Sequence, residues 1–270
     1  MSRIALIAGA GALPAALVAD FSVRGQPVLV CAPEGVTPDA LPVDLAFRFE
    51  RLAPFLRHLG DQGITQVVLA GAIHRPVLDP SLFDRETAGF VPALMAAMQG
   101  GDDAALRWVI GLIEAFDLTV AGLVDVAPGL LASEGVMSAR TPSRDEITDA
   151  ARGGAILDAL APVDVGQGCV VASGLCLGIE ALYGTDALLA DVASHRPERA
   201  PHRGGVFIKR AKAGQDLRAD LPTVGPATIA AAVDAGLSAI SLQAGRVVIL
   251  DREGVAAAAN AAGLALWAQP

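Results

Sequence analysis

The residues best suited to chemistry in this sequence lie close together near position 220. Asp216 and Asp220 flank Arg218, and Lys212 lies just upstream. Phosphoryl transfer needs positive charge on the phosphate oxygens and a carboxylate that holds Mg²⁺ or orients water. Prolines at positions 222 and 226 stiffen the loop and would hold Asp220 in one orientation. The stretch therefore predicts phosphoryl-transfer chemistry, and the alternative is a polar surface loop with chance charges.

Basic side chains gather just before and within this loop, although the whole chain carries a net charge of −9. The members of this basic cluster are Arg196, Arg199, Arg203, Lys209, Arg210, Lys212 and Arg218. The two lysines are the only ones in the chain. The cluster indicates either an anion site, for a phosphate or an anionic lipid head group, or a solvated basic face.

A glycine-rich loop near the N-terminus offers a second place for a phosphate. Gly9 and Gly11 lie between an apolar run and a helix that begins at Pro14. The N–H groups of a helix start and the helix dipole favour a bound phosphate. The dinucleotide fingerprint G-x-G-x-x-G is incomplete, because Pro14 stands at the third glycine. The loop therefore predicts a phosphate cradle or a structural turn, and it is weak support for NAD binding.

Polar residues also follow or begin other predicted elements. His74 and Arg75 come after a predicted strand, where α/β sheets bind their ligands, and an ordinary surface histidine is the alternative. Asp102 begins one predicted helix, and Thr185 and Asp186 begin another. Helix capping explains acids at such positions, with metal ligation as the alternative.

The elements that must position these residues alternate between strand and helix. In the first half we expect strands at 4–8, 28–31, 66–70 and 118–126, and helices at 14–23, 52–59, 89–99 and 103–116. In the second half a capping box at Ser143 and Glu146 begins a helix to about 160. We expect further strands at 169–173, 206–209 and 246–250, helices at 186–194 and 227–235, and a terminal Ala-rich helix. The pattern predicts two α/β domains joined by a linker, the first Rossmann-like with a parallel sheet.

Composition narrows the class of protein. Hydrophobic residues make up 53% of the chain and charged residues 18%, which excludes a disordered chain. The acidic net charge argues against nucleic-acid binding. No apolar run reaches the roughly 18–20 residues of a spanning helix, and no secretory signal is evident. The odd number of cysteines, without a CxxC pair, predicts reduced, buried thiols in a cytoplasmic protein.

Six segments, in order along almost the whole chain, resemble the LpxI-type UDP-2,3-diacylglucosamine pyrophosphatases of lipid A synthesis. The family patterns are GGGxLP, AGxxxRP, GDD, DxGQ, ExxxGTD and KxxQDxRxDxPxxG. They correspond to residues 9–14, 70–76, 101–103, 164–167, 180–186 and 212–225. The departure is Ala10, where the family commonly has a second glycine, and its methyl group would narrow the backbone approach to a ligand. Together the six patterns are specific.

The resemblance implies hydrolysis of the diphosphate of UDP-2,3-diacylglucosamine to UMP and 2,3-diacylglucosamine 1-phosphate (lipid X). It implies Mg²⁺ as cofactor, with Mn²⁺ as the alternative, and a cytoplasmic homodimer in peripheral contact with the inner face of the inner membrane. It implies that residues 1–132 bind UDP and that 133–142 form a linker. Residues 143–270 would bind the acylated sugar and carry the catalytic loop.

The resemblance also assigns roles to residues. The essential aspartate of the family falls on Asp220, so we expect Asp220, Lys212 and Asp216 to be catalytic, with Asp220 and Asp216 as metal ligands. The expected substrate-binding residues are Gly9, Gly11, Ala12, Leu13, His74, Arg75, Asp102, Gln167, Thr185, Asp186, Lys209, Arg218 and Thr223.

Two other functions stay open at this point. One is a nucleotide-dependent oxidoreductase on a Rossmann-like domain, against which Pro14 counts. The other is a non-catalytic lipid-binding protein, against which the concentrated charges of residues 212–225 count.

Overall fold

The chain folds into two compact units. A computed structural model describes residues 3–73, 77–99, 102–199, 201–212, 214, 216–218 and 220–270, without the side chains of 102 and 103. The first unit comprises Met1–Ala127 and Asp216–Asp220, and the second comprises Pro128–Gln215 and Leu221–Pro270. The sequence division assigned residues 216–220 to the C-terminal domain, whereas the contacts group them with the N-terminal unit.

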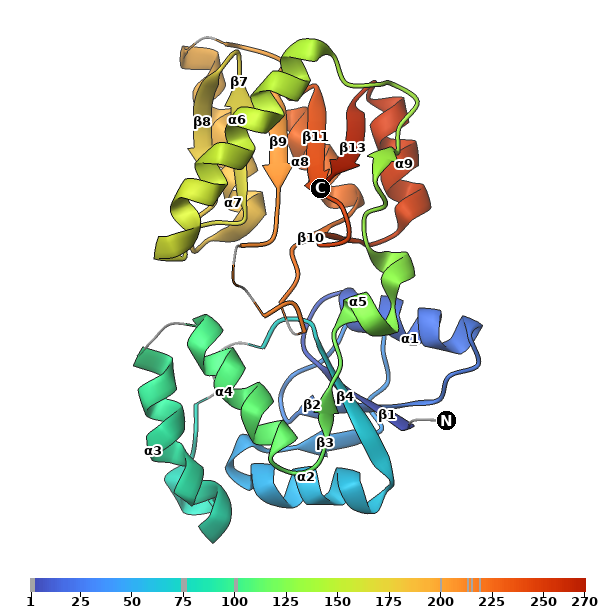
Figure 1. The fold of residues 1–270 in the computed structure, drawn as a ribbon, viewed down its shortest axis with the longest axis vertical. Coiled ribbons are helices and arrows are strands. Elements are labelled where there is room, and N and C mark those ends of the chain that lie inside the picture. The colour runs from blue at the N-terminus through green and yellow to red at the C-terminus, as the bar shows by residue number, and fades with distance from the viewer. Residues whose placement is uncertain are drawn as a thin grey trace. The chain divides into compact units, whose positions relative to one another are not determined.

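The first unit is a parallel α/β sheet (Figure 1). Its five strands are all parallel and have the order β3-β2-β1-β4-β5. The expected Rossmann-like arrangement is therefore confirmed, because the order reverses between β1 and β4. The elements are β1 (Arg3–Ala8), α1 (Leu13–Val23), β2 (Val28–Pro33), β3 (Leu45–Phe47), α2 (Leu52–Asp61), β4 (Ile64–Ala70), α3 (Arg85–Gln99), α4 (Asp102–Glu114), β5 (Thr119–Val120) and α5 (Leu123–Val126).

Helices cover both faces of this sheet because side chains alternate along each strand. Ala5 and Ile7 of β1 pack with buried side chains of α2 and α4 in one apolar cluster. The alternate residues Ile4 and Leu6 point to the opposite face. α1 lies on that other side of the sheet (Figure 1) and buries Leu17 and Phe21. The loops at the carboxyl edge thus project from a sheet that is packed on both faces.

The second unit is built on a mixed sheet. Its six strands have the order β6-β13-β11-β9-β7-β8, in which β9, β11 and β13 are parallel and the others antiparallel to their neighbours. β10 and β12 form a separate parallel pair. The elements are β6 (Gly135–Val136), α6 (Arg144–Leu160), β7 (Gly168–Ala172), β8 (Leu175–Ile179), α7 (Gly184–His195), β9 (Val206–Lys209), β10 (Thr223–Val224), α8 (Pro226–Asp234), β11 (Ala239–Gln243), β12 (Val248–Ile249), α9 (Arg252–Ala261) and β13 (Ala265–Gln269).

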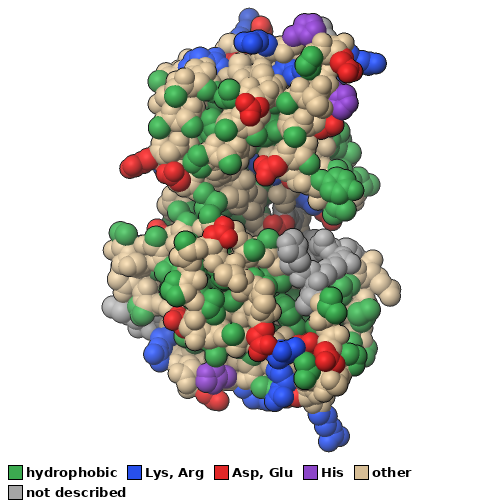
Figure 2. Space-filling view, turned by 180° about the vertical axis from the view of Figure 1, so that it is seen from behind, with side chains coloured by type: hydrophobic (Ala, Val, Ile, Leu, Met, Phe, Trp, Pro, Cys, Tyr) green, Lys and Arg blue, Asp and Glu red, His purple; other side chains and the backbone are tan. Residues whose placement is uncertain are grey.

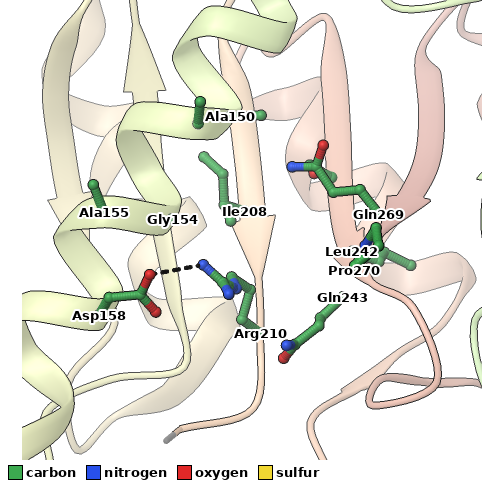
Figure 3. A pocket seen from close by; sticks show the side chains of 12 residues that line it. Ala150, Gly154, Ala155, Asp158, Ile208, Arg210, Leu242, Gln243, Gln269 and Pro270 are labelled. Atoms are coloured by element: carbon green, nitrogen blue, oxygen red, sulfur yellow. Dashed lines mark hydrogen bonds and ion pairs between the residues drawn. The ribbon is translucent and has the colours of Figure 1, made fainter.

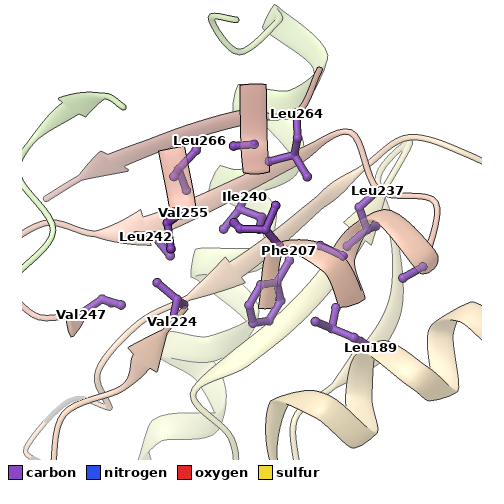
Figure 4. Close-up of a cluster of buried hydrophobic side chains, with 14 of the residues drawn as sticks. Leu189, Phe207, Val224, Leu237, Ile240, Leu242, Val247, Val255, Leu264 and Leu266 are labelled. Atoms are coloured by element: carbon purple, nitrogen blue, oxygen red, sulfur yellow. The ribbon is translucent and has the colours of Figure 1, made fainter. Parts of the chain in front are cut away.

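The two faces of the second sheet have separate cores. Phe207 and Ile240 belong to the larger core, which they share with α7, α8 and α9 (Figure 4). Ile208 and Trp267 belong to the other, which they share with α6. Consecutive residues of β9 therefore face opposite helical layers. This alternation sends Lys209 to the α7 face and Arg210 to the α6 face.

The capping box predicted at the start of α6 is confirmed. Ser143 accepts a hydrogen bond from the N–H of Glu146 at 3.2 Å, and Glu146 accepts one from the N–H of Ser143 at 2.8 Å. Arg140 and Ser238 also donate to the Glu146 carboxylate, at 2.7 and 2.6 Å. Burial opposes ionisation, but these hydrogen bonds outweigh it and lower the pKa of Glu146 to about 2. The ionised carboxylate therefore ties two segments, the connector 140–143 and the loop at Ser238, to the first turn of α6.

Several expected elements differ in the structure. The strand expected at 118–126 is only Thr119–Val120, followed by the short helix α5. β3, β8, β11 and β13 were not expected, and β6 lies within the stretch predicted to be a linker. Cys31 and Cys169 are buried as predicted, but the prediction is wrong for Cys176, which is exposed because β8 is an edge strand. Over the described ranges, no helix is long and apolar enough to cross a membrane.

Candidate active site

The loops after β1 and β4 are joined backbone to backbone at the point where the strand order reverses. The N–H of Gly9 donates to the carbonyl of Ala70 at 2.8 Å. Ala10 and Ala72 exchange two further hydrogen bonds, at 2.8 and 2.9 Å, as an isolated antiparallel bridge. The N–H groups of Gly9 and Ala10 are therefore already used and cannot also hold a phosphate. Any cradle must be built from the residues that follow them.

Glycine is required at this junction for two separate reasons. A Cβ on Gly9 would lie 2.5 Å from the carbonyl oxygen of Ala72, so a side chain would push the two loops apart. Gly71 has the same close approach to Ala10, with a φ of +89°. Gly11 has open space around it but a φ of +94°, which L residues adopt only with strain. Gly9 thus closes the junction, and Gly11 turns the chain into α1.

The start of α1 is the part of this loop that can bind an anion. Ala12 is the N-cap and has no side-chain oxygen with which to cap the helix, and Pro14 occupies the first turn. The first backbone bond of the helix runs from the N–H of Ala16 to the carbonyl of Ala12. Within the described chain, the N–H groups of Gly11, Ala12 and Leu13 have no backbone partner. They are donors that a phosphate could accept from.

The segment 216–220 carries the densest charge chemistry of the first unit. Arg218 lies between two carboxylates: its Nη2 donates to Asp216 Oδ2 at 2.7 Å, and its Nη1 donates to Glu114 Oε1 at 2.7 Å. The side-chain hydrogen bond from Arg218 lowers the pKa of Asp216, and burial only partly opposes it. The same bond raises the pKa of Arg218. Both groups therefore stay ionised, with the guanidinium held in a fixed position.

Close packing fixes this segment further. A Cβ on Gly122 would lie 3.2 Å from the Cα of Arg218, so a glycine lets the segment pack tightly here. Asp220 is exposed, and its N–H lies 3.4 Å from the carbonyl of Asp216 in a turn. The segment thus carries an exposed aspartate two residues after an arginine that is held by two acids.

In the second unit, Lys209 belongs to a buried polar network. Its Nζ donates to Glu180 Oε2 at 2.6 Å and to Thr185 Oγ1 at 2.7 Å, and Thr185 donates to the same carboxylate at 3.0 Å. Lys209 is 3% exposed and Glu180 8%. A Cβ on Gly168 would lie 2.7 Å from Glu180 Oε2. The network thus joins the end of β9 to the start of α7 and has little access to a substrate.

The residues around position 165 are held by the same part of the sheet. Lys212 Nζ donates to Asp164 Oδ1 at 2.8 Å, and Asp164 itself has a left-handed φ of +58°. The carbonyl of Gln167 accepts from the N–H of Arg210 at 2.8 Å. Asp164, Gln167 and Lys212 are therefore brought together at the carboxyl end of β9, as a polar group more exposed than the Lys209 network.

A pocket of about 210 Å³ opens beside α6 at the carboxyl ends of β9, β11 and β13 (Figure 3). Arg210 Nη1 lies 3.3 Å from Asp158 Oδ2 across its mouth. A Cβ on Gly154 would lie 2.8 Å from this guanidinium, so the glycine leaves it room. Gln243 and Gln269 add amides. The pocket therefore offers several hydrogen-bonding groups to a polar ligand.

A second pocket of about 290 Å³ has a mainly apolar lining. It is lined by Met137, Ile249, Arg252, Glu253, Val255, Ala256 and Leu266. Arg252 is occupied there, because its Nη2 donates to the carbonyls of Gly129 and Leu131. The remaining surface is suited to an aliphatic group.

Five of the seven members of the basic cluster seen in the sequence are held by carboxylates or by backbone carbonyls. Lys209, Arg210, Lys212 and Arg218 each pair with a carboxylate. Arg196 is 6% exposed and donates to three backbone carbonyls, which makes it a structural residue. On the side of the molecule shown in Figure 2, charged side chains are dispersed among uncharged ones. Anion binding would therefore depend on individual lysine or arginine side chains, each held in position by a carboxylate.

Comparison with known proteins identifies the family. Residues 3–130 match the family described as the LpxI N-terminal domain, and residues 133–267 match the LpxI C-terminal domain. The UDP-2,3-diacylglucosamine pyrophosphatase LpxI of Caulobacter vibrioides is 34% identical over 273 aligned positions, which cover 98% of this chain and 96% of that protein. The chain belongs to the LpxI family. The resemblance predicted from six short segments is thereby confirmed.

The motif residues of the LpxI family fall into distinct structural settings. Gly9, Gly11, Ala12 and Leu13 form the turn into α1, whereas Thr185 and Lys209 lie in the buried network. Asp186 lies in the first turn of α7, as expected, whereas Thr223 begins the short strand β10, which was not expected. His74 and Arg75, and the side chain of Asp102, lie outside the described residues. The assigned roles stay predictions.

Two residues of these settings were not among the expected site residues. Glu114 ends α4 and pairs with Arg218 from 104 positions away, and no local pattern signals that pairing. Glu180 pairs with Lys209, and its only sequence signal is its place in the ExxxGTD pattern.

The donor set fits a divalent cation only in part. The part of the chain that the structure describes holds no group of three His, Cys, Asp or Glu side chains able to bind a metal. Asp216 is already occupied by Arg218, which favours a positioning role over metal ligation. Mg²⁺ is commonly held by one or two carboxylates together with substrate phosphates. Asp220 is exposed and suits that arrangement.

Proposed function

We propose that this chain hydrolyses the diphosphate of UDP-2,3-diacylglucosamine to UMP and 2,3-diacylglucosamine 1-phosphate. Its Caulobacter relative is named a UDP-2,3-diacylglucosamine pyrophosphatase. The observation that carries the proposal is the match to that relative over nearly the whole of both chains. The reaction adds water to one phosphorus and breaks the bridging P–O bond. The two products are phosphate monoesters.

The first unit supplies groups suited to the nucleotide end. The N–H groups of Gly11, Ala12 and Leu13 would hold phosphate oxygens at the start of α1. Arg218 would neutralise charge that builds up on the phosphate, and Asp216 and Glu114 hold its guanidinium in position. Asp220 would orient the attacking water. These roles account for the density of charge in residues 216–220.

The second unit supplies groups suited to the acylated sugar. Lys212, held by Asp164, would contact phosphate oxygens, with Gln167 close by in the chain. The polar pocket beside α6 could take hydroxyl or amide groups of the sugar, and the apolar pocket has the lining that an acyl chain needs. Lys209 and Thr185 would support this region rather than bind substrate, because both are engaged with Glu180.

We propose Mg²⁺, with Mn²⁺ as the alternative, as the cofactor. Asp220 would hold it together with diphosphate oxygens, and the bound cation would offset the negative charge of the diphosphate. Homodimerisation and peripheral contact with the inner face of the inner membrane stay predictions from the family resemblance.

The direct test is turnover of UDP-2,3-diacylglucosamine in detergent micelles, scored as release of UMP and lipid X. We expect turnover that is lost with EDTA and restored by added Mg²⁺. Full turnover in metal-free buffer would overturn the cofactor assignment alone. No turnover with either metal would overturn the proposed reaction.

A further inference from the structure

Glu34 lies at the same edge of the first sheet as the loop that turns into α1. It directly follows β2, which pairs with β1 so that Cys31 is beside Ile7. On its other side β2 pairs with β3 as far as Pro33, which is beside Phe47. Neighbouring strands are ~5 Å apart. Glu34 and the turn that offers its N–H groups to a phosphate therefore follow the carboxyl ends of two neighbouring parallel strands.

The backbone and side chain of Glu34 are both held. Its N–H donates to the carbonyl of Phe47 at 2.7 Å, and its Oε2 accepts from Arg48 Nη1 at 2.6 Å. Arg48 Nε lies 3.5 Å from the carboxylate of the buried Glu50, at ion-pair distance but without a hydrogen bond among the described residues. The carboxylate of Glu34 is thus directed by a chain of charged groups that runs back into the protein.

One oxygen of this carboxylate remains available. The side chain of Glu34 is 51% exposed, and among the described residues no hydrogen bond reaches its Oε1. Gly35 follows with a φ of +84° and open space beside it. An exposed ion pair of this kind contributes little to folding. Glu34 can therefore be replaced without unfolding the unit, and its exposed oxygen can accept from a ligand.

A carboxylate at this position can bind only certain groups of a nucleotide. A carboxylate repels phosphate but accepts strong hydrogen bonds from hydroxyl groups. In open parallel sheets, a ligand whose phosphates lie at the first helix start places its ribose near the end of the second strand. We propose that Glu34 binds the ribose hydroxyls of the uridine nucleotide and makes the first unit selective for ribonucleotides over deoxyribonucleotides. This inference rests on the proposed function for the identity of the nucleotide.

The test compares the affinities of UDP, 2′-deoxy-UDP and 3′-deoxy-UDP for the full chain by titration calorimetry. We expect UDP to bind about 10- to 100-fold more tightly than at least one deoxy analogue, as for a lost hydrogen bond to a charged group. Glu34→Ala should remove most of this preference by weakening UDP alone. The matched control is Glu86→Gln, which alters another exposed, arginine-paired carboxylate of the same unit and should keep the preference.

The outcomes separate this inference from the function on which it rests. Equal affinity of the wild-type protein for all three nucleotides would overturn the ribose contact and leave the proposed hydrolysis intact. A preference that survives in Glu34→Ala would assign ribose recognition to another residue and also overturn the inference. If UDP does not bind at all, the nucleotide assignment of the proposed function fails together with it.

Discussion

The two units hold their functional loops in different ways. In the first unit, backbone hydrogen bonds and the absence of side chains at Gly9 and Gly71 join the loops after β1 and β4. In the second unit, buried charges hold the elements together: Lys209 at the end of β9 pairs with Glu180 after β8 and donates to Thr185 of α7, and Glu146 connects α6 to its neighbours. The first arrangement depends on shape, and the second depends on charge.

Each unit therefore tolerates a different kind of perturbation. A backbone junction is sensitive to one added methyl group and insensitive to pH. A buried ion pair tolerates small changes in shape but not the loss of one partner. The chain provides a reporter for each unit, because Trp108 lies on α4 of the first unit and Trp267 on β13 of the second. Fluorescence of Trp267→Phe and Trp108→Phe backgrounds can therefore follow the first and the second unit separately.

The largest expected loss of stability comes from breaking the buried pair. Lys209→Met should destabilise the second unit by about 3–5 kcal/mol, because the Glu180 charge stays buried without its partner. Urea unfolding followed by Trp267 fluorescence measures this. Lys209→Met/Glu180→Gln should recover a large part of the loss, since no uncompensated charge remains. Equal destabilisation in the single and double variants would show that the pair is not the cause.

Acidification should weaken the second unit through Glu146. The folded pKa of about 2 lies below the ordinary value of 4.5, so the ionised carboxylate stabilises the fold above pH 4.5. This stabilisation is lost as the pH falls from 4.5 towards 2, and it amounts to roughly 3 kcal/mol. Urea unfolding at several pH values, again followed by Trp267, should show a flatter pH dependence for Glu146→Gln than for the wild-type protein. Parallel pH profiles would contradict the role of Glu146.

A smaller effect is expected at the backbone junction of the first unit. Gly9→Ala should destabilise it by about 1–3 kcal/mol, because the new Cβ would meet the carbonyl of Ala72. In Gly11→Ala the new Cβ would meet no neighbouring atom. Its only effect on stability is the backbone strain of a positive φ, about 1–2 kcal/mol. Trp108 fluorescence in urea compares the two variants at neutral and acid pH. A larger loss in Gly11→Ala, or a loss that changes with pH, would show that the junction is not held by shape.

The sequence was most informative where one strand or helix carries its own signal. The strands predicted at 4–8, 28–31, 66–70 and 206–209 and the capping box at Ser143 are confirmed. β13 was missed because three of its five residues are alanine or leucine, and β11 because Ile240 is its only β-branched residue. β8 had a usable signal: Ser173 and Gly174, both with positive φ, form a two-residue hairpin turn between apolar runs.

Long-range pairing accounts for what the sequence could not predict at the site. The grouping of residues 216–220 with the N-terminal unit depends on Arg218 reaching Glu114 and packing on Gly122. Neither partner lies near residue 218 in the chain. The sequence did identify the charged residues of the candidate site. Which of them are exposed and which belong to the buried Lys209 network follows from the alternation of side chains along the strands of the folded sheet.

The variant Asp220→Ala tests whether residues 216–220 carry out the hydrolysis. UMP release from UDP-2,3-diacylglucosamine should fall by about 10³-fold or more, because the group that orients water or holds the cation is lost. Binding of the intact substrate, measured by titration, should persist, and Asp61→Ala, an exposed aspartate at the end of α2, should keep full turnover. Near-normal UMP release by Asp220→Ala would contradict the account.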